Sequence, residues 1–385
     1  MTRIAFTADL HVDEYGSRRD AATGLNARLV DYLATLRWLA DQASDEQECG
    51  ALVIAGDFTE RRHPAPWLVS QIRDALSVGP SRQVYLRGNH DGEIAGGSIV
   101  SILDDGIGSA AEEEWRAGVS VPQLQPISFE AVLACIPYID RHWLRAQAGF
   151  ADVTDAEVYQ VLAAQFLTIA RGLYAEAKRD YPDAGVVLVC HQTLAGAHLS
   201  ESQQAFLGDQ QLVVSVADLE AIGFEGIVAG HLHRHQALSA TTLYAGSIER
   251  VDFGEEGDAK GFVVADVGPG RFEWQFIETP ARAFVTLRGD VNADDLPASE
   301  LDGAIVRAID VAPSTDLEVL RTRIEKAGAF EITQLTHAPV ATAAIAGGLA
   351  ETLSAEQALE AYFEGDPDVD ALIERGRRIL EAVGA

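Results

Sequence analysis

The sequence predicts an α/β protein with a layered core, and three observations support this. Over the first 280 residues, short apolar runs alternate with amphipathic helical patterns, as in layered α/β folds. The apolar runs end in polar residues of metal-ligand type. Beyond Thr242 the pattern changes to closely spaced strands, and a smaller unit follows Pro280.

The apolar runs account for the core elements in chain order. Short buried strands are predicted at 4–6, 51–55, 84–86, 186–189 and 226–229. Leucines at helical spacing between Leu25 and Leu39 predict a helix between the first two strands. A second long helix is predicted to begin at a capping box formed by Thr154 and Glu157.

The C-terminal part divides into further units. Strands are expected at 243–244, 262–264, 272–277 and 284–285. We therefore expect three domains: a catalytic core at 1–280, a capping unit at 281–350, and two short helices at 351–385. The apolar stripe of the last helix could dock on a partner coiled coil or pack on the capping unit.

Composition limits the classes of function. The 385 residues carry 59 acidic and 29 basic side chains, a net charge of −30, which excludes a uniformly basic coat for nucleic acid. Three widely spaced cysteines suggest neither a disulfide framework nor a zinc motif. With no signal-like segment and no apolar run long enough to span a bilayer, we expect a cytoplasmic protein that does not associate with membranes.

The polar residues at the strand ends form the main chemical signal. In chain order the strand ends carry Asp9 and His11, Asp57, Asn89 and His90, His191, and finally His231 and His233. Because ligands bind beyond the carboxyl ends of strands in open α/β sheets, we expect these side chains to converge. Residues two apart in extended backbone project to one face, which would pair Asp9 with His11 and His231 with His233.

These residue types suit a pair of divalent cations. The seven ligands carry only the two negative charges of Asp9 and Asp57 against four positive charges on the ions. The remaining positive charge fits hydrolysis of a phosphate ester by a two-metal mechanism. His90 follows a ligand directly and could donate a proton to the leaving oxygen. Mixed oxygen and nitrogen ligands suit manganese, iron or zinc.

Each short motif alone is more often a cap, a turn or a surface polar group, but the ordered series after strand-like runs favours a joint site. The remaining histidines are interpreted as surface or core residues, and Cys190 as a buried strand residue.

The series D-x-H, G-D, G-N-H-D, H and G-H-x-H resembles the signature of the calcineurin-like metallophosphoesterases between Asp9 and His233. Within that superfamily, the segments 245–250, 252–255, 260–262 and 279–282 resemble the SbcD-type DNA repair nucleases. The resemblance implies a four-layer α/β/β/α core with a smaller α/β capping domain and short C-terminal helices.

The resemblance also implies roles for individual residues. Asp9, His11, Asp57 and His233 would hold one metal, and Asp57, Asn89, His191 and His231 the other. His90 would be the catalytic histidine. Some family members carry a second histidine where this chain has Glu60, so a second catalytic role at this position is uncertain.

The implied activity is manganese-dependent DNA exonuclease and endonuclease action, by a homodimer with an SbcC-type ATPase partner. Arg18, Arg61, Arg62 and Arg87 near the site loops are candidate substrate-binding residues. Two alternatives stay open. One is a phosphodiesterase for cyclic or small nucleotides, and the other is a non-catalytic scaffold that holds an ATPase at DNA ends.

Overall fold

The computed structural model describes residues 1–92, 99–103, 115–147, 149–155, 157–199, 203, 212–291, 296–338, 373 and 375. The elements of its first part are β1 (Thr2–Thr7), α1 (Ala27–Asp41), the π-helical η1 (Gln42–Glu46), β2 (Ala51–Ile54), α2 (Pro66–Leu76), β3 (Arg82–Leu86), α3 (Ile99–Leu103), β4 (Trp115–Val119), β5 (Gln123–Pro126), β6 (Ala131–Ile136), α4 (Arg141–Ala146) and α5 (Val158–Asp180). They are followed by β7 (Gly185–His191), β8 (Thr193–Leu194), β9 (Val213–Val214), α7 (Val216–Glu220), β10 (Gly226–Gly230), β11 (Gln236–Ala237), β12 (Thr242–Tyr244), the 3-10 helix η2 (Phe253–Glu255), β13 (Gly261–Gly268), β14 (Arg271–Glu278), β15 (Phe284–Gly289), α8 (Ala298–Leu301), β16 (Ile305–Val311), α9 (Leu317–Lys326) and β17 (Glu331–His337).

Two six-stranded sheets form the core. The first has the order β14-β13-β1-β2-β3-β4, and β1 to β4 run parallel to one another. The second has the order β11-β12-β10-β7-β6-β5, in which β12, β10, β7 and β6 are parallel. The central strands β2 and β7 are buried along their whole length, which explains why they are continuous apolar runs.

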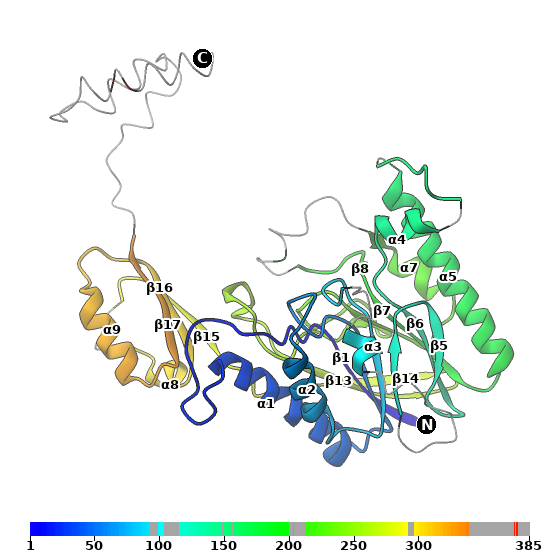
Figure 1. The fold of residues 1–385 in the computed structure, drawn as a ribbon, viewed down its shortest axis with the longest axis horizontal. Helices are drawn as coiled ribbons and strands as arrows, with labels where there is room; N and C mark the ends of the chain where they lie inside the picture. Colours follow the sequence, from blue (N-terminus) through cyan, green and yellow to red (C-terminus); the bar gives the residue numbers. More distant parts are fainter. Residues whose placement is uncertain are drawn as a thin grey trace.

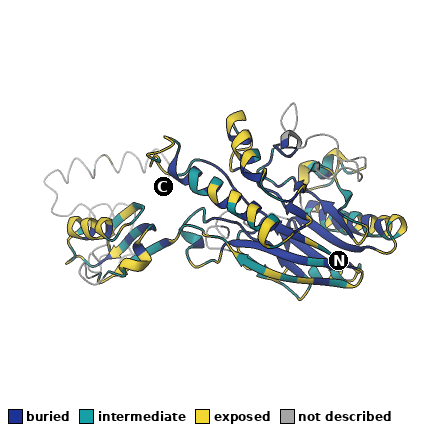
Figure 2. Ribbon diagram, turned by 90° about the horizontal axis from the view of Figure 1, so that it is seen from below, coloured by how far each residue is buried: buried dark blue, intermediate teal, exposed yellow. Residues whose placement is uncertain are grey.

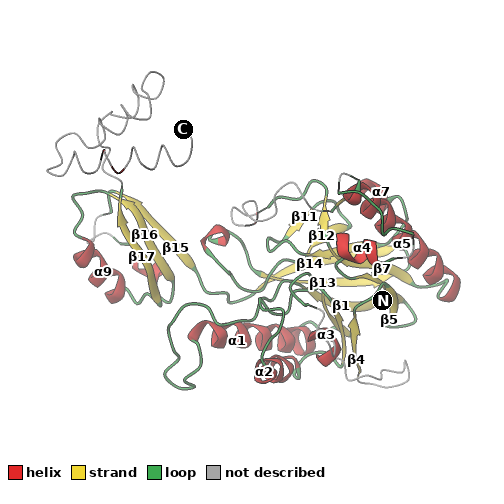
Figure 3. Ribbon diagram, turned by 45° about the horizontal axis from the view of Figure 1, so that its top comes forward, coloured by secondary structure: helices red, strands yellow, loops and turns green. Residues whose placement is uncertain are grey.

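Helices cover the outer face of each sheet and complete four layers (Figure 3). Helices α1, α2 and α3 pack on the first sheet around Leu29, Leu36 and Ile72. Helix α5 packs on the second sheet through Leu162 and Phe166. A third cluster fills the space between the two sheets, and Figure 2 shows this buried interior under partly exposed helices. The predicted four-layer α/β/β/α fold is confirmed.

A separate sheet with the order β15-β16-β17 lies to one side of this core, with α8 and α9 on it (Figure 1). It has a small core of its own, which includes Leu301, Val306 and Leu320. Arg282, just before β15, ties it to the first layer by an ion pair with Asp31 at 2.6 Å, and its guanidinium stacks 3.6 Å from the ring centroid of Phe330. We call this sheet with its helices the β15–β17 unit.

The structure changes two expected element boundaries, the start of α5 and the end of β2. Helix α5 begins at Val158, four residues after Thr154, because the Thr154 hydroxyl bonds the Glu157 carboxylate rather than a backbone N–H. The capping box is therefore not formed. The strands predicted in the core and at 243–285 lie within observed strands, except that Ala55, predicted as the end of the second strand, follows the end of β2 at Ile54. The domain limits at 280 and 350 stay predictions, and the two C-terminal helices lie outside the described residues apart from 373 and 375.

Candidate metal centre

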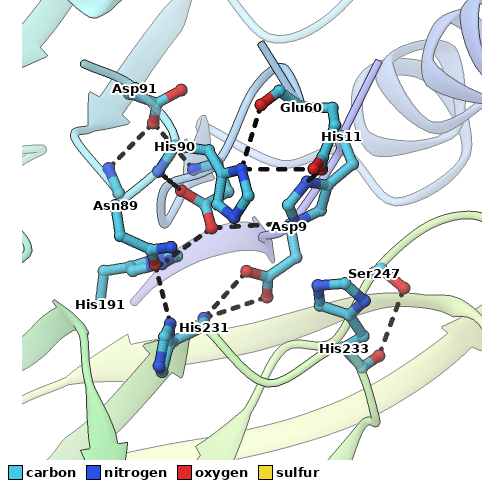
Figure 4. A network of polar contacts seen from close by, with 12 residues as sticks. Asp9, His11, Glu60, Asn89, His90, Asp91, His191, His231, His233 and Ser247 are labelled. Atoms are coloured by element: carbon cyan, nitrogen blue, oxygen red, sulfur yellow. Dashed lines mark hydrogen bonds and ion pairs between the residues drawn. The ribbon is translucent and has the colours of Figure 1, made fainter. Parts of the chain in front are cut away.

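The predicted ligands all follow the carboxyl ends of parallel strands (Figure 4). Asp9 and His11 follow β1, Asp57 follows β2, and Asn89 and His90 follow β3 of the first sheet. The second sheet contributes His191, the last residue of β7, and His231 and His233 after β10. The site thus lies where the carboxyl ends of both sheets meet, as the strand-end argument predicts.

The ligand atoms gather in two groups. Asp9, His11 and His233 offer atoms within 4.8 Å of one another, and so do Asp57, His191 and His231. The Asn89 amide oxygen joins the second group, at 2.9 Å from His191 Nε2 and 2.8 Å from His231 Nδ1. All seven residues predicted as ligands are brought together.

Asp57 lies between the two groups. Its Oδ1 accepts the backbone N–H of His90 at 2.8 Å. Its Oδ2 is 3.2 Å from His191 Nε2 and 3.8 Å from His11 Nε2, which belong to different groups. A carboxylate placed in this way can serve both groups at once.

The candidate ligands point toward one another because the backbone leaves the extended conformation, and not because residues two apart share a face of a strand. Asp9, His11 and Asp57 have φ angles of 51°, 43° and 55°, and His231 has 93°. Non-glycine residues rarely adopt positive φ. Each such residue costs about 1–3 kcal/mol, and the conformation persists only where the surrounding fold enforces it. The expectation that Asp9 and His11 share a face of an extended strand is therefore wrong, because the backbone has already left the β conformation at both residues.

The donor set fits divalent cations. His11 is 2% exposed, and its Nε2 is a buried nitrogen without a hydrogen-bond partner among the described residues. An unpaired buried nitrogen is costly unless it receives a partner. Since this nitrogen faces the carboxylate of Asp57 and lies in the group with Asp9 and His233, a cation bound there would satisfy it.

Three ligand histidines are oriented through their Nδ1 atoms. His11 Nδ1 donates to the Glu60 carboxylate at 2.8 Å, His233 Nδ1 to Glu255 at 2.5 Å, and His191 Nδ1 to the Ala55 carbonyl at 2.7 Å. Such bonds fix the ring orientation and favour the tautomer in which Nε2 can bind a metal. His231 is reversed and presents Nδ1 to Asn89.

The sequence did not indicate the histidine contacts of two orienting residues, Glu60 and Glu255. Glu60, considered above as an uncertain second catalytic position, has its carboxylate on His11, so the geometry favours a positioning role. Glu255 lies 22 residues beyond His233, and no spacing rule connects them. It was noticed only as part of a resembling segment.

Asp91 joins two of the ligand loops. It is 1% exposed and accepts three backbone N–H groups, from Asp57 at 2.8 Å, Phe58 at 2.9 Å and Gly88 at 2.9 Å. Burial and the neighbouring charge of Asp57 raise the pKa of Asp91 to about 7, against the opposing effect of the backbone donors. The sequence motif placed Asp91 after His90 but gave it no role.

Burial and the charges of neighbouring groups also shift the pKa values of His191 and His231. Burial lowers the pKa of His191, but the Asp57 carboxylate outweighs it and raises this pKa to about 9. Burial, followed by the charge of His191, lowers the pKa of His231 to about 3, so His231 is neutral, as a metal ligand must be. The Asp57 carboxylate thus favours the protonated form of His191.

His90 stands at the edge of the centre. Its Nδ1 lies 3.1 Å from the Glu60 carbonyl oxygen, and its ring centroid is 4.9 Å from that of His11. The side chain is 33% exposed. His90 shares with the ligands His11, Asp57, Asn89, His231 and His233 a cavity of about 340 Å³. The partly exposed His90 ring therefore borders a cavity that a substrate could enter.

The candidate arginines divide into two pairs. Arg62 and Arg87 line a cavity of about 610 Å³ that also contains Asn89. Arg61 instead pairs with Asp13 at 2.9 Å, and Arg18 lies over the Phe330 ring of the β15–β17 unit at 4.5 Å. Neither Arg18 nor Arg61 lines the cavities described beside the metal centre.

Comparisons with known proteins identify the family of this chain. Residues 2–235 match the family model for calcineurin-like phosphoesterases. Among solved structures, the chain is similar to a dimetal phosphatase from Danio rerio, with 12% identity, a TM-score of 0.41, and coverage of 72% of this chain and 98% of the other. It is also similar to GAP50, the anchor in the inner membrane complex of Plasmodium, with 12% identity, a TM-score of 0.41, and coverage of 72% and 84%. A third is the purple acid phosphatase PPD1 from yellow lupin, with 12% identity, a TM-score of 0.38, and coverage of 72% and 53%. Among the described residues, no helix has the length and apolar character needed to span a membrane.

Proposed function

Because this chain belongs to the calcineurin-like phosphoesterase family and is a metal-dependent hydrolase, we propose that it cleaves phosphodiester bonds in DNA. In this proposal it is the manganese-dependent nuclease subunit of an SbcCD-like repair complex, with both exonuclease and endonuclease action. The observation that carries the hydrolytic part is the pair of ligand groups joined by Asp57, with His90 exposed beside them.

The protein's own residues would divide the work as follows. Asp9, His11, Asp57 and His233 would hold one divalent ion, and Asp57, Asn89, His191 and His231 the other. When bound, such ions polarise the phosphoryl group and activate water at neutral pH. The mixed oxygen and nitrogen donors suit manganese, iron or zinc, and manganese is proposed among them because of the resemblance to the SbcD-type nucleases.

His90 would act on the leaving group. Since its Nδ1 is held by the Glu60 carbonyl, its Nε2 is the atom placed to deliver a proton to the leaving oxygen. A positioned general acid of this kind contributes about 10²–10⁴-fold to a rate. Arg62 and Arg87 would hold a neighbouring phosphate in the adjoining cavity.

The choice of DNA as substrate is supported by the resembling segments 245–250 and 279–282. These lie where the core meets the β15–β17 unit: Glu249 and Arg250 contact Arg28, and Arg282 contacts Asp31. Because the chain has a net charge of −30, an ATPase partner of SbcC type would supply much of the DNA affinity. A homodimer in the cytoplasm belongs to the same proposal.

The test is a cleavage assay on end-labelled duplex DNA and on bis-p-nitrophenyl phosphate with manganese. Wild type is compared with His90→Ala, and with His337→Ala as a matched histidine control outside the core. We expect cleavage of both substrates, loss of at least about 100-fold in His90→Ala with both ions still bound, and no change in the control. Full activity of His90→Ala would refute the catalytic role. Turnover of cyclic nucleotides without DNA cleavage, with or without the ATPase, would replace the nuclease by a small-nucleotide phosphodiesterase.

A further inference from the structure

The segment from Asp252 to Lys260 has no part in the mechanism above, although it lies against the metal centre. It comprises the short helix η2 and the turn that leads into β13. Within the segment, Glu255 contacts the side chain of a candidate ligand, His233, and its neighbours Phe253 and Glu256 contact the β15–β17 unit. These two sets of contacts are described in turn.

Glu255 is the residue of this segment that reaches the metal centre. Its Oε1 accepts from His233 Nδ1 at 2.5 Å, and its Oε2 accepts from Lys260 Nζ at 2.8 Å and from the backbone N–H of Val251 at 3.0 Å. With 1% exposure, the carboxylate is fixed from both sides. It therefore allows His233 only one ring orientation and one tautomer.

The positive charge of Lys260 balances the negative charge of the buried Glu255 carboxylate. Its side chain is fully buried, and besides Glu255 it donates to Ser247 Oγ at 2.9 Å. A buried carboxylate without a cation would be expensive, and it would add a further negative charge beside the ligands. The comparable partner of His11, Glu60, is 42% exposed and needs no such buried cation.

The same segment holds the β15–β17 unit. Glu256, the next residue, accepts from the Thr286 backbone N–H at 2.7 Å and from its hydroxyl. The Phe253 ring packs edge-on against Phe284 at 4.9 Å, and the Arg307 guanidinium lies 4.3 Å from the Phe253 ring centroid. Consecutive residues thus contact a metal ligand and the first strand of the neighbouring unit.

We propose that Glu255, held by Lys260, is a positioning residue for His233, and that η2 makes the orientation of this ligand depend on the docking of the β15–β17 unit. A shift of that unit would move Phe253 and Glu256, and with them the carboxylate that fixes His233. The inference rests on the metal centre proposed above but not on DNA being the substrate.

The first experiment measures manganese binding by calorimetry, and the spin coupling between bound ions by electron paramagnetic resonance. Glu255→Gln is compared with wild type. The matched control is Glu225→Gln, since Glu225 also accepts from a lysine, Lys178, and from a backbone N–H, that of Val186, but lies outside the centre. We expect Glu255→Gln to bind one ion about 10–100-fold more weakly, with loss of the coupled spectrum, and the control to match wild type.

The second variant tests the link to the β15–β17 unit without altering any residue that touches His233. Glu256→Ala removes the two Thr286 contacts. Arg288→Ala is its control, because Arg288 pairs with Asp310 of the same sheet and its loss leaves the contacts of η2 intact. We expect Glu256→Ala to raise the dissociation constant of one manganese ion by at least about threefold.

The outcomes separate the inference from its premise. Two coupled ions of wild-type affinity in Glu255→Gln would refute the positioning role, and unchanged affinity in Glu256→Ala would refute the link through η2. Should Glu255→Gln fail to fold, Glu256→Ala still tests the link through η2, and unchanged affinity there would refute it. A wild type that bound no pair of ions would instead overturn the proposed metal centre.

Discussion

Removal of the Asp91 carboxylate tests whether the ligand loops are held by buried hydrogen bonds. Asp91→Ala leaves three backbone N–H groups, those of Asp57, Phe58 and Gly88, without their acceptor. A buried donor left unpaired costs about 1–3 kcal/mol, so the variant should lose about 3 kcal/mol or more of unfolding free energy. Asp57 should also lose its fixed place, and with it the binding of at least one ion.

Asp91→Asn provides a graded comparison. Its amide oxygen can keep the two donors that share Oδ2, Asp57 and Gly88, whereas the amide nitrogen faces the N–H of Phe58. The expected loss is therefore about 1–3 kcal/mol, for one unpaired donor. Asp316→Ala serves as control, because this carboxylate caps α9 at the surface and accepts two N–H groups that water can reach. Its loss should be about 0.5–2 kcal/mol.

The assay is urea unfolding followed by circular dichroism, with metal content measured on the same samples. The order of stability should be control, then Asp91→Asn, then Asp91→Ala. If Asp91→Ala unfolded within about 1 kcal/mol of wild type and kept two ions, the reasoning from buried donors would be refuted.

Three further predictions follow from the same geometry. A Cβ atom on Gly88 would lie 2.2 Å from Asp57 Oδ1 and 2.5 Å from the Asp57 backbone nitrogen. Gly88→Ala should therefore lose at least one bound ion and all hydrolytic activity. Two bound ions in the purified variant would contradict this. Removal of metal with EDTA should lower the melting temperature, since a ligand at 100 times its dissociation constant stabilises the native state by about 2.7 kcal/mol; identical melting curves with EDTA and with manganese would count against the centre. Burial raises the pKa of Cys49 and Cys190 to about 12 and also raises the pKa of Cys135, so all three stay protonated thiols at pH 8. The native protein should therefore not react with Ellman's reagent, whereas the unfolded chain should expose three reactive thiols. Rapid labelling of the native protein would show that these thiols are not buried.

The strand positions and the gathering of the candidate ligands were predictable because both follow local rules. A central parallel strand is apolar throughout, so β2 and β7 are visible as runs, and the residues after them must lie at the carboxyl edge of a sheet. That argument brought Asp57 and His191 together without a structure.

The backbone conformations and hydrogen-bond partners of the candidate ligands were harder to predict from the sequence. The positive φ of Asp9 and His11 is enforced by loop contacts, such as the bonds from their N–H groups to the Gly56 and Asp57 carbonyls. Glu255 reaches His233 only because η2 folds back between two strands, and nothing in the spacing of these residues indicates it. The start of α5 was misplaced because a side-chain contact between Thr154 and Glu157 replaced the expected cap.

The two ligand groups each draw on both sheets. One combines Asp9 and His11 of the first sheet with His233 of the second, and the other combines Asp57 and Asn89 with His191 and His231. Bound ions would therefore cross-link the two halves of the core at one end. The sheets could then part there only after an ion had left, so the unfolding rate, and with it resistance to proteolysis, would depend on how slowly the ions dissociate.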